Sequence, residues 1–572
     1  MLPQNKAWQQ AFNAPGIYPV YDPANDNTFP DKYASPDAVG FTANFYNPVA
    51  TANYYDSQNE NYQVLTNFYA QFQLLPEKLN FRTSYSYDYS AIRGREYIAP
   101  YYVSSWQQQA VSELTKKDTN YYNYIWDNIL TYNNQWGKHN FGAMLGYSMR
   151  QQQYRYMWGK ANNVPEGKDE WLYLSQGNAE GVTLGDDGYC YRGQSYFTRL
   201  SYDYAGKYLL TFTMRADGSS KYQEHWGYFP SVGAAWVISE EDFMKDIKWL
   251  TSLKLRASYG ISGNFNIGNY EYYATLSEDN YVFGKADGTL ASGLRPATAG
   301  NPDLGWEKTA MFNLGLEIGL FNMLTLELDL YNSNTTDMLL NVPVAEFSGF
   351  STVPMNIGKV NNRGWEIALT SQKNFTKDFG YSFNANYATN TNEVKALGPG
   401  NAPIISTGSV DHAYYITKVG EPIGCYYLLV QDGIFSNEEE LKKYPHFSNT
   451  QPGDFRFVDV DGDGVMDLDK DRTIVGNYMP DFTYGFGGKV WFKGFDLDFN
   501  FQGVYGNEIL NLNRRYIDNL EGNTNGTTIA LNRWKSADNP GNGQVNRANR
   551  KSKGYNGRTS TWHLEDGSYL RL

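Results

Sequence analysis

Residues 324–330 read Leu-Thr-Leu-Glu-Leu-Asp-Leu, and residues 495–501 read Phe-Asp-Leu-Asp-Phe-Asn-Phe. In both stretches every second side chain is large and apolar, and the side chains between are polar. A β-strand places successive side chains on opposite faces, so each stretch predicts a strand with one apolar and one polar face. Similar stretches recur along most of the 572-residue chain.

The recurring pattern predicts strands close to the roughly 9–11 residues of a tilted membrane strand. The expected strands are residues 79–89, 121–133, 141–150, 196–204, 208–216, 228–238, 253–261, 312–320, 324–332, 364–371, 381–390, 483–491 and 495–505. Their connections alternate between short and long. Short ones cover 205–207, 321–323 and 492–494, and long ones cover 151–190, 262–308, 336–360, 391–481 and 506–557. Outer-membrane barrels have short turns at one end and long loops at the other.

Composition agrees with a barrel and excludes other classes. Mean hydropathy is −0.58, and no run approaches the roughly 20 apolar residues of a membrane-spanning helix. Aromatic residues make up 16% of the chain, with 49 Tyr and 14 Trp, and these two residue types favour the membrane–water boundary. The net charge of −13 argues against a nucleic-acid partner. We expect an all-β fold, a transmembrane antiparallel β-barrel with large loops on one face.

Cysteine usage and the start of the chain bear on its organisation. Cys190 and Cys425 are too few for a disulfide scaffold, and the sequence leaves open whether they pair. The opening Met-Leu-Pro-Gln-Asn-Lys lacks the basic and apolar regions of a signal peptide. We expect residues 1–572 to form one incomplete barrel domain. The acidic run at 437–443 is interpreted as a solvated turn rather than a short helix.

Several ordered segments resemble one known family. They are Gly206-Lys207-Tyr208-Leu209-Leu210, Arg215-Ala216-Asp217-Gly218-Ser219-Ser220-Lys221, Phe229-Pro230-Ser231-Val232-Gly233-Ala234-Ala235-Trp236, Leu253-Lys254-Leu255-Arg256-Ala257-Ser258-Tyr259-Gly260, Ser262-Gly263-Asn264, Asn301-Pro302-Asp303-Leu304-Gly305-Trp306-Glu307, Asn356-Ile357-Gly358, Asn362-Arg363-Gly364-Trp365-Glu366, Pro452-Gly453-Asp454, Val458-Asp459-Val460-Asp461-Gly462-Asp463-Gly464 and Glu565-Asp566-Gly567-Ser568-Tyr569-Leu570-Arg571-Leu572. Together they resemble the SusC/RagA-type TonB-dependent transporters of Bacteroidetes, over most of the chain from about residue 40.

The resemblance implies a barrel of the TonB-dependent receptor type in the cell outer membrane, with about 22 strands and a plugged lumen when complete. It implies import of oligosaccharides or peptides, a SusD-like surface lipoprotein as partner, and a TonB complex that acts through the plug region. In the family a signal sequence, a TonB-interacting segment and a plug precede these motifs, and at least one strand follows them. The chain is therefore expected to be a fragment that lacks these parts.

The aspartate-rich stretch at 459–471 is the most specific local motif. It follows a calcium-loop pattern, with Gly464 at position 6 and Lys470 where position 12 should be acidic. Because close carboxylates repel unless a cation gathers them, the pattern predicts Ca²⁺ or a similar hard cation bracing a loop. The alternative is an Asp/Gly-rich turn without metal. The candidate ligands are Asp459, Asp461, Asp463, Asp467 and Asp471.

No motif predicts catalysis. Residues 215–220 lack the strand–glycine loop–helix context of a phosphate site and are interpreted as a strand end running into a polar turn. The histidines, His139, His225, His412, His446 and His563, have no metal-like spacing. No nucleophile–base or paired-carboxylate arrangement comes with supporting context. We expect no enzyme activity, no catalytic residue and no other cofactor.

Aromatic clusters are the remaining candidates for ligand contact as a group, although interfacial or loop packing is the favoured interpretation of any single tyrosine. They are Pro100-Tyr101-Tyr102-Val103 with Trp106, Tyr272-Tyr273 and Tyr414-Tyr415. No substrate-contacting residue is assigned from them. Three functions remain open: energised import, a passive porin-like or structural barrel, and a soluble carbohydrate-binding β-protein. The last requires the face that carries Leu324 to Leu330 to be covered by a second sheet.

Overall fold

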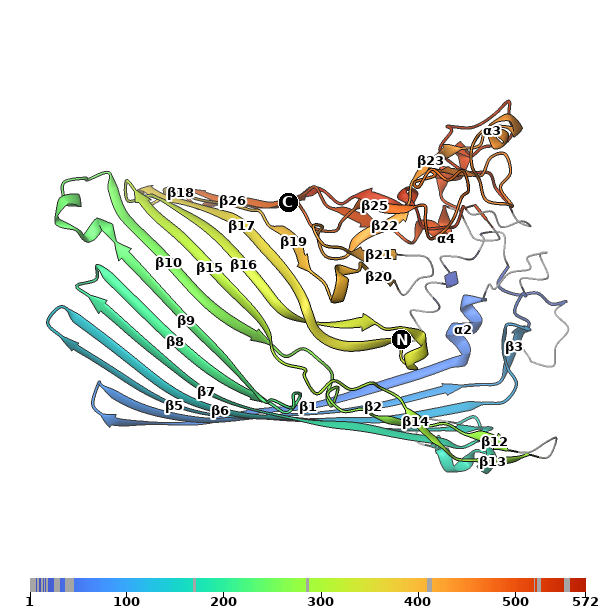
Figure 1. Cartoon of the computed structure of the whole chain (residues 1–572), viewed down its shortest axis with the longest axis horizontal. Helices are drawn as coiled ribbons and strands as arrows, with labels where there is room; N and C mark the ends of the chain where they lie inside the picture. The colour runs from blue at the N-terminus through green and yellow to red at the C-terminus, as the bar shows by residue number, and fades with distance from the viewer. Residues whose placement is uncertain are drawn as a thin grey trace.

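The computed structural model describes residues 46–572 except 168–170, 284–287, 409–413, 519, 522–525 and 550–555. It also describes residues 7, 10, 11, 14, 16, 19–24 and 31–35. The predicted loops at 151–190, 262–308, 391–481 and 506–557 therefore fall partly outside the described residues. Figure 1 shows a large curved sheet with irregular segments gathered at one end.

One antiparallel sheet dominates the fold and, within the described ranges, contains sixteen strands. Each inner strand of its main path pairs with the strand before and after it, β1 and β30 lie at the two ends, and β19 (Thr391–Ala396) pairs beside that path with β17. The path consists of β1 (Tyr55–Leu75), β2 (Leu79–Ile98), β5 (Glu113–Trp136), β6 (His139–Asn162), β7 (Thr183–Tyr204), β8 (Tyr208–Ser219), β9 (Trp226–Val237), β10 (Leu250–Asn264), β15 (Glu307–Leu320), β16 (Leu324–Pro343), β17 (Thr352–Thr376), β18 (Phe379–Ala388), β26 (Phe482–Phe492), β27 (Phe495–Tyr505) and β30 (Tyr569–Arg571).

Register keeps the large apolar side chains on one face of the sheet. Leu328 of β16 lies opposite Leu316 of β15 and Ile367 of β17. When the residue pairing is followed from strand to strand across the sheet, Phe68 of β1 and Phe501 of β27 also lie on this face. A slip of one residue would turn a strand's apolar side chains to the polar face, so this register confirms the alternation predicted from the sequence.

The polar face is the concave one. The side chain of Ile98, at the loop end of β2, points to the same side as the polar face and packs in a cluster with Ala50 of α2 (Pro48–Tyr54). Figure 1 shows α2 on the side of β1 and β2 that faces the opposite half of the sheet. The apolar face is therefore convex and points away from the interior.

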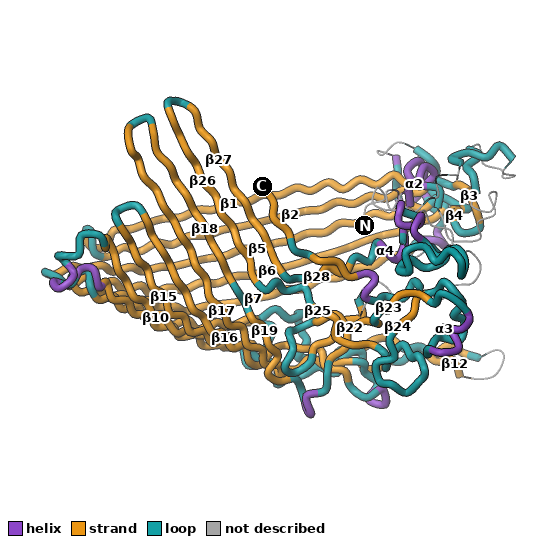
Figure 2. The backbone as a smooth tube through the Cα atoms, turned by 90° about the horizontal axis from the view of Figure 1, so that it is seen from above, coloured by secondary structure: helices purple, strands orange, loops and turns teal. Residues whose placement is uncertain are grey.

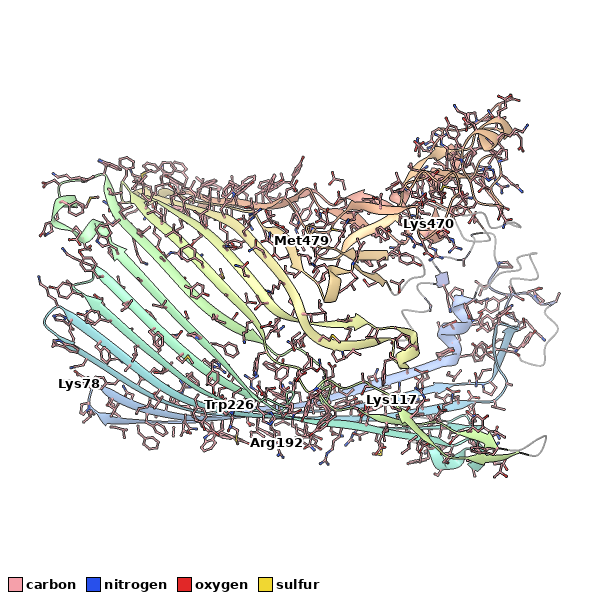
Figure 3. All side chains as sticks on the ribbon, viewed as in Figure 1. Lys78, Lys117, Arg192, Trp226, Lys470 and Met479 are labelled. Carbon is pink, nitrogen blue, oxygen red and sulfur yellow. The ribbon has the colours of Figure 1, made fainter. Side chains whose placement is uncertain are left out.

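The two ends of the sheet differ, as the sequence predicts. Tight turns at 76–78, 137–138, 205–207, 321–323, 377–378 and 493–494 join strands at one end, where β9 and β10 are joined by residues 238–249. Longer segments join most strands at the other end. In Figure 3, Lys78 marks the turn end and Lys470 lies in the loops at the opposite end. Figure 2 shows the irregular segments gathered at that end, viewed from above.

Aromatic side chains of the convex face form two belts. The belt near the turns contains Trp136, Phe141, Tyr204, Tyr208, Trp236, Phe375, Phe379, Phe492 and Phe495. The belt toward the loops contains Trp126, Tyr147, Tyr196, Tyr228, Tyr259, Phe312, Trp365, Tyr387, Phe482 and Tyr505. Between Phe379 and Tyr387, or between Phe495 and Tyr505, a strand tilted by about 40° rises roughly 20–25 Å. That height matches the apolar band of an outer-membrane barrel.

Strand ends are the main error of the sequence prediction. Residues 151–162 and 183–190 belong to β6 and β7 rather than to a loop, and only 344–351 of the predicted loop 336–360 lies outside β16 and β17. Beyond the loop-side belt the convex face of β6 becomes polar, as at Gln151 and Arg155, and its concave face carries aromatic rings, as at Tyr154, so alternation ends while backbone pairing continues. β1 was not predicted, because Leu65 and Tyr69 on its polar face obscure the alternation.

The acidic run at 437–443 is also corrected. It forms a helix, α3 (Glu438–Lys443), rather than a turn. The Asn437 side chain accepts hydrogen bonds from the backbone N–H groups of Glu439 and Glu440, which caps the helix start. Acidic residues in the first turn and lysines in the last complement the helix dipole.

The loop end carries small sheets and short helices. They are β3 (Tyr101–Ser104) with β4 (Gln107–Gln109), β11 (Leu276–Glu278) with β14 (Leu294–Pro296), β12 (Tyr281–Phe283) with β13 (Thr289–Ala291), β20 (Ile404–Thr407) with β21 (Tyr414–Thr417), β22 (Cys425–Leu429) and β25 (Arg472–Gly476), β23 (Gln431–Ile434) with β24 (Phe455–Phe457), β28 (Glu508–Leu510) with β29 (Leu564–Asp566), and α4 (Arg514–Ile517). Among the described residues, no helix has the length and hydrophobicity to cross a membrane.

Leu328→Arg tests the orientation of the sheet. Leu328 lies on the convex face between the two belts, so Arg there is expected to destabilise the bilayer-inserted protein by roughly 2–4 kcal/mol. Glu327→Gln, on the neighbouring residue of the polar face, should have little effect. The measurement is the denaturant midpoint of protein folded into lipid vesicles, and equal midpoints for the two variants would contradict this orientation.

Candidate functional site

A network of charged side chains crosses three strands on the concave face. Arg256 of β10 donates a hydrogen bond of 2.7 Å from Nη2 to Asp329 Oδ2 on β16. Its Nε lies 3.1 Å from Glu317 Oε1 on β15, and Lys254 Nζ lies 3.3 Å from the same oxygen. These side chains are only partly exposed, so the polar wall carries fixed charges of both signs in paired form.

Gly315 makes the reach of Arg256 possible. It lies opposite Arg256 on one side and Asp329 on the other, and a Cβ there would stand 2.6 Å from Arg256 Nε. The guanidinium therefore passes over a strand position that has no side chain. The polar residues between the leucines of 324–330 indicate a water-facing side of the sheet. The sequence does not predict the space above Gly315 or the ion pair between Arg256 and Asp329 across it.

Residues 215–220 form no anion-binding loop. β8 continues through Ser219, which confirms the strand interpretation. The Arg215 guanidinium lies 2.7 Å from Asp217 Oδ2 and donates a hydrogen bond of 2.9 Å to Ser195 Oγ on β7. Its charge is thus already paired within the sheet.

Two loop segments pack together over a shared core. Residues from 429–466 supply the buried side chains, and Trp534 and Trp562 from the later segment pack against them. The buried Asp454 carboxylate accepts hydrogen bonds from Arg547 Nε (2.7 Å) and Asn556 Nδ2 (2.9 Å). Because removing one partner of a buried ion pair leaves an uncompensated charge, this contact holds the two segments in one arrangement.

His563 is a second buried polar group in this unit. Its Nδ1 accepts a hydrogen bond from the Ser560 backbone N–H, which starts the short 3₁₀ helix Thr561–His563. Burial, and then the nearby Arg514 guanidinium, lower the pKa of His563 to about 4. The imidazole is therefore neutral near pH 7.

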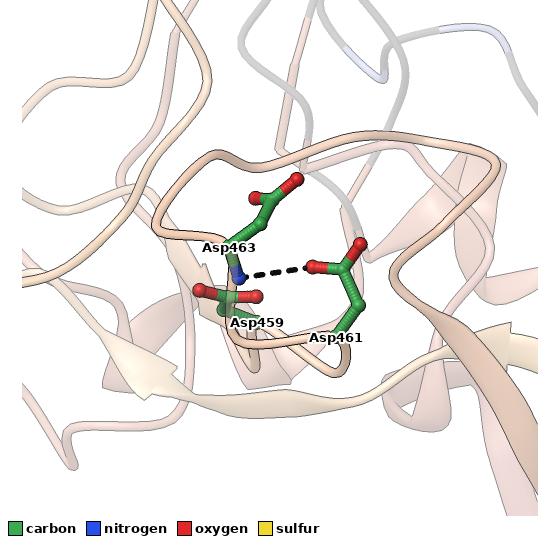
Figure 4. Close-up of side chains that lie close together, drawn as sticks. All are labelled: Asp459, Asp461 and Asp463. Carbon is green, nitrogen blue, oxygen red and sulfur yellow. Dashed lines mark hydrogen bonds between the residues drawn. The ribbon is translucent and has the colours of Figure 1, made fainter.

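The structure brings three of the five predicted metal ligands together (Figure 4). Asp459, Asp461 and Asp463 each offer one carboxylate oxygen, and these oxygens lie within 4.8 Å of one another. Asp459 accepts hydrogen bonds from the backbone N–H groups of Gly462 and Gly464. Both glycines have a left-handed φ (73° and 80°) that side-chain-bearing residues rarely adopt, so the sharp turn requires them.

Asp467 and Asp471 do not join this trio. Asp471 is buried, and its oxygens accept hydrogen bonds from the backbone N–H groups of Val460 and Asp467. Backbone N–H donors from Asp469 and Lys470 lower the pKa of Asp467. These two carboxylates brace the base of the loop.

Oxygen-only ligands in close array suit a hard cation such as Ca²⁺. Within the trio, Asp463 also lies 3.3 Å from the Lys470 ammonium, which offsets part of the repulsion and raises the pKa of Lys470. The trio is the one cluster of potential metal ligands in the described part of the chain. His412 lies outside the described residues.

The predicted aromatic clusters mostly serve packing. Tyr101 is buried and stacks on Tyr54 with ring centroids 4.7 Å apart. The Arg472 guanidinium lies 3.5 Å from the centre of the Tyr414 ring. Trp106 is exposed. Both cysteines are free thiols, and burial raises the pKa of Cys425 to about 11.

Comparison with known proteins identifies the family. Residues 7–413 match the family model described as the β-barrel of TonB dependent receptor-like proteins. The chain belongs to the TonB-dependent receptors. With its convex apolar band, this receptor barrel is an outer-membrane protein.

The receptor is similar to several members of the family. It is 30% identical over 570 residues to TonB-dependent receptor P3 of Formosa agariphila, an alignment that covers 98% of this chain and 53% of the relative. It is 34% identical over 349 residues to TonB-dependent receptor SusC of Bacteroides thetaiotaomicron, covering 59% of this chain and 33% of SusC. A solved structure of the RagAB peptide transporter has a TM-score of 0.77 at 26% identity, covering 93% of this chain and 57% of that chain. The chain thus spans about half the length of these relatives or less.

Acid should loosen the loop unit of the receptor. Because the pKa of His563 falls from 6.5 to about 4 on folding, the unfolded segment binds a proton below pH 6.5 that the folded one does not. Stability is therefore unaffected above pH 6.5 and decreases as pH falls toward 4, by about 2 kcal/mol at pH 5. Hydrogen-exchange protection factors at residues 508–517 and 560–566 should fall between pH 7 and pH 5. His563→Gln should remove this fall, and an equal fall in that variant would rule out His563 as the cause.

Chelation tests the aspartate loop. If a divalent cation gathers Asp459, Asp461 and Asp463, EDTA should increase proteolytic cleavage between Asp454 and Arg472 of the detergent-solubilised receptor, because the carboxylates then repel. Asp461→Asn should already be cleaved faster and should respond less to EDTA. Cleavage that EDTA does not change in the unsubstituted receptor would argue against a bound cation.

Proposed function

We propose that this receptor imports oligosaccharides or peptides across the outer membrane in an energised process. The observation that carries the proposal is the sorting of side chains across the sheet, with an apolar convex face between two aromatic belts and a charged concave face. A polar interior accepts hydrated solutes that the bilayer excludes.

The similar proteins support both the route and the class of cargo. SusC of Bacteroides thetaiotaomicron is a TonB-dependent receptor, and the RagAB structure is that of a peptide transporter. From these similarities we infer a SusD-like surface lipoprotein that contacts the loop end and a TonB complex that acts through a plug region. The packed loop unit joined by Asp454 and Arg547 offers such a partner a defined surface.

A passive pore with the same barrel is the second candidate, and energy dependence separates the two. We propose no catalytic role for the receptor. For the aspartate trio we propose a structural Ca²⁺ or similar cation, because the three carboxylates converge and two of the three residues are exposed.

Uptake by living cells tests the proposal. A strain deleted for the gene should lose uptake of a fluorescent oligosaccharide or peptide that the parent strain imports, and the full-length gene should restore it. A protonophore should stop this uptake, because TonB-coupled transport needs the proton gradient of the inner membrane. Uptake that continues with the protonophore would support the passive pore, and unchanged uptake after deletion would reject both.

A further inference from the structure

Three tyrosines form a row across neighbouring strands near the loop end of the sheet. Tyr121 of β5 lies opposite Tyr154 of β6, which lies opposite Tyr189 of β7. The ring centroids are 5.1 Å and 5.3 Å apart. Tyr156, two residues further along β6, lies nearly parallel to Tyr154 at 6.3 Å. We call Tyr121, Tyr154 and Tyr189 the tyrosine row.

Register places the row on the concave, polar face. Tyr121 lies opposite Ser90 of β2, which lies opposite Gln63 of β1, all on the face that carries the charged network. The adjacent residue, Tyr122, points to the convex face, where its ring lies 5.1 Å from that of Tyr89. The pair Tyr121–Tyr154 on the concave face and the pair Tyr122–Tyr89 on the convex face thus have the same ring spacing, but the first faces the interior and the second faces outward.

The row lies beyond the membrane band, so bilayer anchoring does not explain it. On the convex face of β6, Met149 is followed at the same orientation by Gln151 and Arg155, and Arg155 lies over the Tyr122 ring. On the outer side of β6, polar and charged residues replace apolar ones at this height. The row therefore faces the outer mouth of the barrel.

Hydrogen-bonding groups surround the row. The nearest positions on the concave face include the neutral Ser90, Thr119, Asn123 and Gln152 and the acidic Asp88 and Asp187, and Asn61 and Gln63 lie one strand further away on β1. Asn123 and Gln152 lie opposite each other, one step along the strands from Tyr121 and Tyr154. Within the described residues, the hydroxyl groups of the three tyrosines in the row form no hydrogen bond to protein side chains or backbone.

Aromatic rings on a wetted wall gain free energy when an apolar surface covers them, and the amides and hydroxyls beside them need polar partners. Oligosaccharides offer both at once, since each sugar has C–H surfaces and hydroxyl groups around its edge. A peptide with charged ends would need paired charges of both signs, but the charges beside the row are the acidic Asp88 and Asp187. The chemistry favours a neutral sugar chain.

We propose that Tyr121, Tyr154 and Tyr189, with Asn123 and Gln152, form a contact platform for an oligosaccharide at the outer mouth of the barrel. This inference rests on the proposed import function and narrows its substrate class. The row spans three strands, about 10 Å between its outer rings, which suits a chain laid across the strands rather than a single sugar.

The test compares neighbouring residues of β5. Full-length receptor in nanodiscs is incubated with a labelled pool of neutral plant, algal and microbial oligosaccharides and with a labelled random peptide library, and retained ligands are measured. Tyr121→Ala and Tyr154→Ala should each weaken retention of oligosaccharides by roughly fivefold or more. Tyr122→Ala, which removes a ring of the same spacing on the convex face, should retain them as the unsubstituted receptor does. Tyr121→Phe, which keeps the ring, should lose less than Tyr121→Ala.

Equal retention by Tyr121→Ala and Tyr122→Ala would overturn the platform, as would a receptor that retains no oligosaccharide from the pool. Retention of peptides alone, with energised peptide uptake intact in cells, would reject the sugar assignment and leave the import function standing. Loss of neither sugar nor peptide uptake on gene deletion would instead reject the import function. Thermal unfolding of each variant, matched to that of the unsubstituted receptor, shows that an affinity loss is local.

Discussion

Backbone pairing across a sheet that must lie in hydrocarbon is the constraint on which the rest of the structure depends. Unpaired N–H and C=O groups are too costly in lipid, so neighbouring strands pair over most of their shared length and their register becomes fixed. Once register is fixed, every side chain points either to the bilayer or to the interior. Leu316, Leu328 and Ile367 then share one face, and Arg256, Glu317 and Asp329 share the other.

The same constraint explains why the functional features lie where they do. Within the membrane band the concave face is crossed by the paired charges of Lys254, Arg256, Glu317 and Asp329, which keep it hydrated. Above the band the strands continue without the need to bury an apolar face, and there the tyrosine row and its amides stand on the concave side. Loop segments are free of the register and build their own core around Asp454 and Arg547.

The sequence predicts the strands inside the membrane band well, because apolar and polar side chains alternate where one face of the sheet meets lipid and the other meets water. β27 was predicted with its observed bounds, Phe495–Tyr505. Prediction fails in the outer halves of β6 and β7, where neither face of the sheet meets lipid. It also fails in β1, where Leu65 and Tyr69 occupy the polar face. The aspartate trio was predicted from spacing, but the roles of Asp467 and Asp471 depend on how the loop folds back, which spacing does not record. The contact of Arg256 with Asp329 across Gly315 likewise depends on how three strands pair, which the sequence of any one strand does not show.

The central claim is that one continuous register sorts lipid-facing from interior-facing side chains. Nitroxide labels placed one at a time at residues 324–332 of the receptor in lipid vesicles test it directly, through their collision rates with oxygen and with a water-soluble nickel chelate. The account predicts that both collision rates alternate from one residue to the next, with the oxygen rate highest at the even positions and the nickel rate highest at the odd ones. Similar access at neighbouring positions, or oxygen access that peaks at the odd positions, would contradict it.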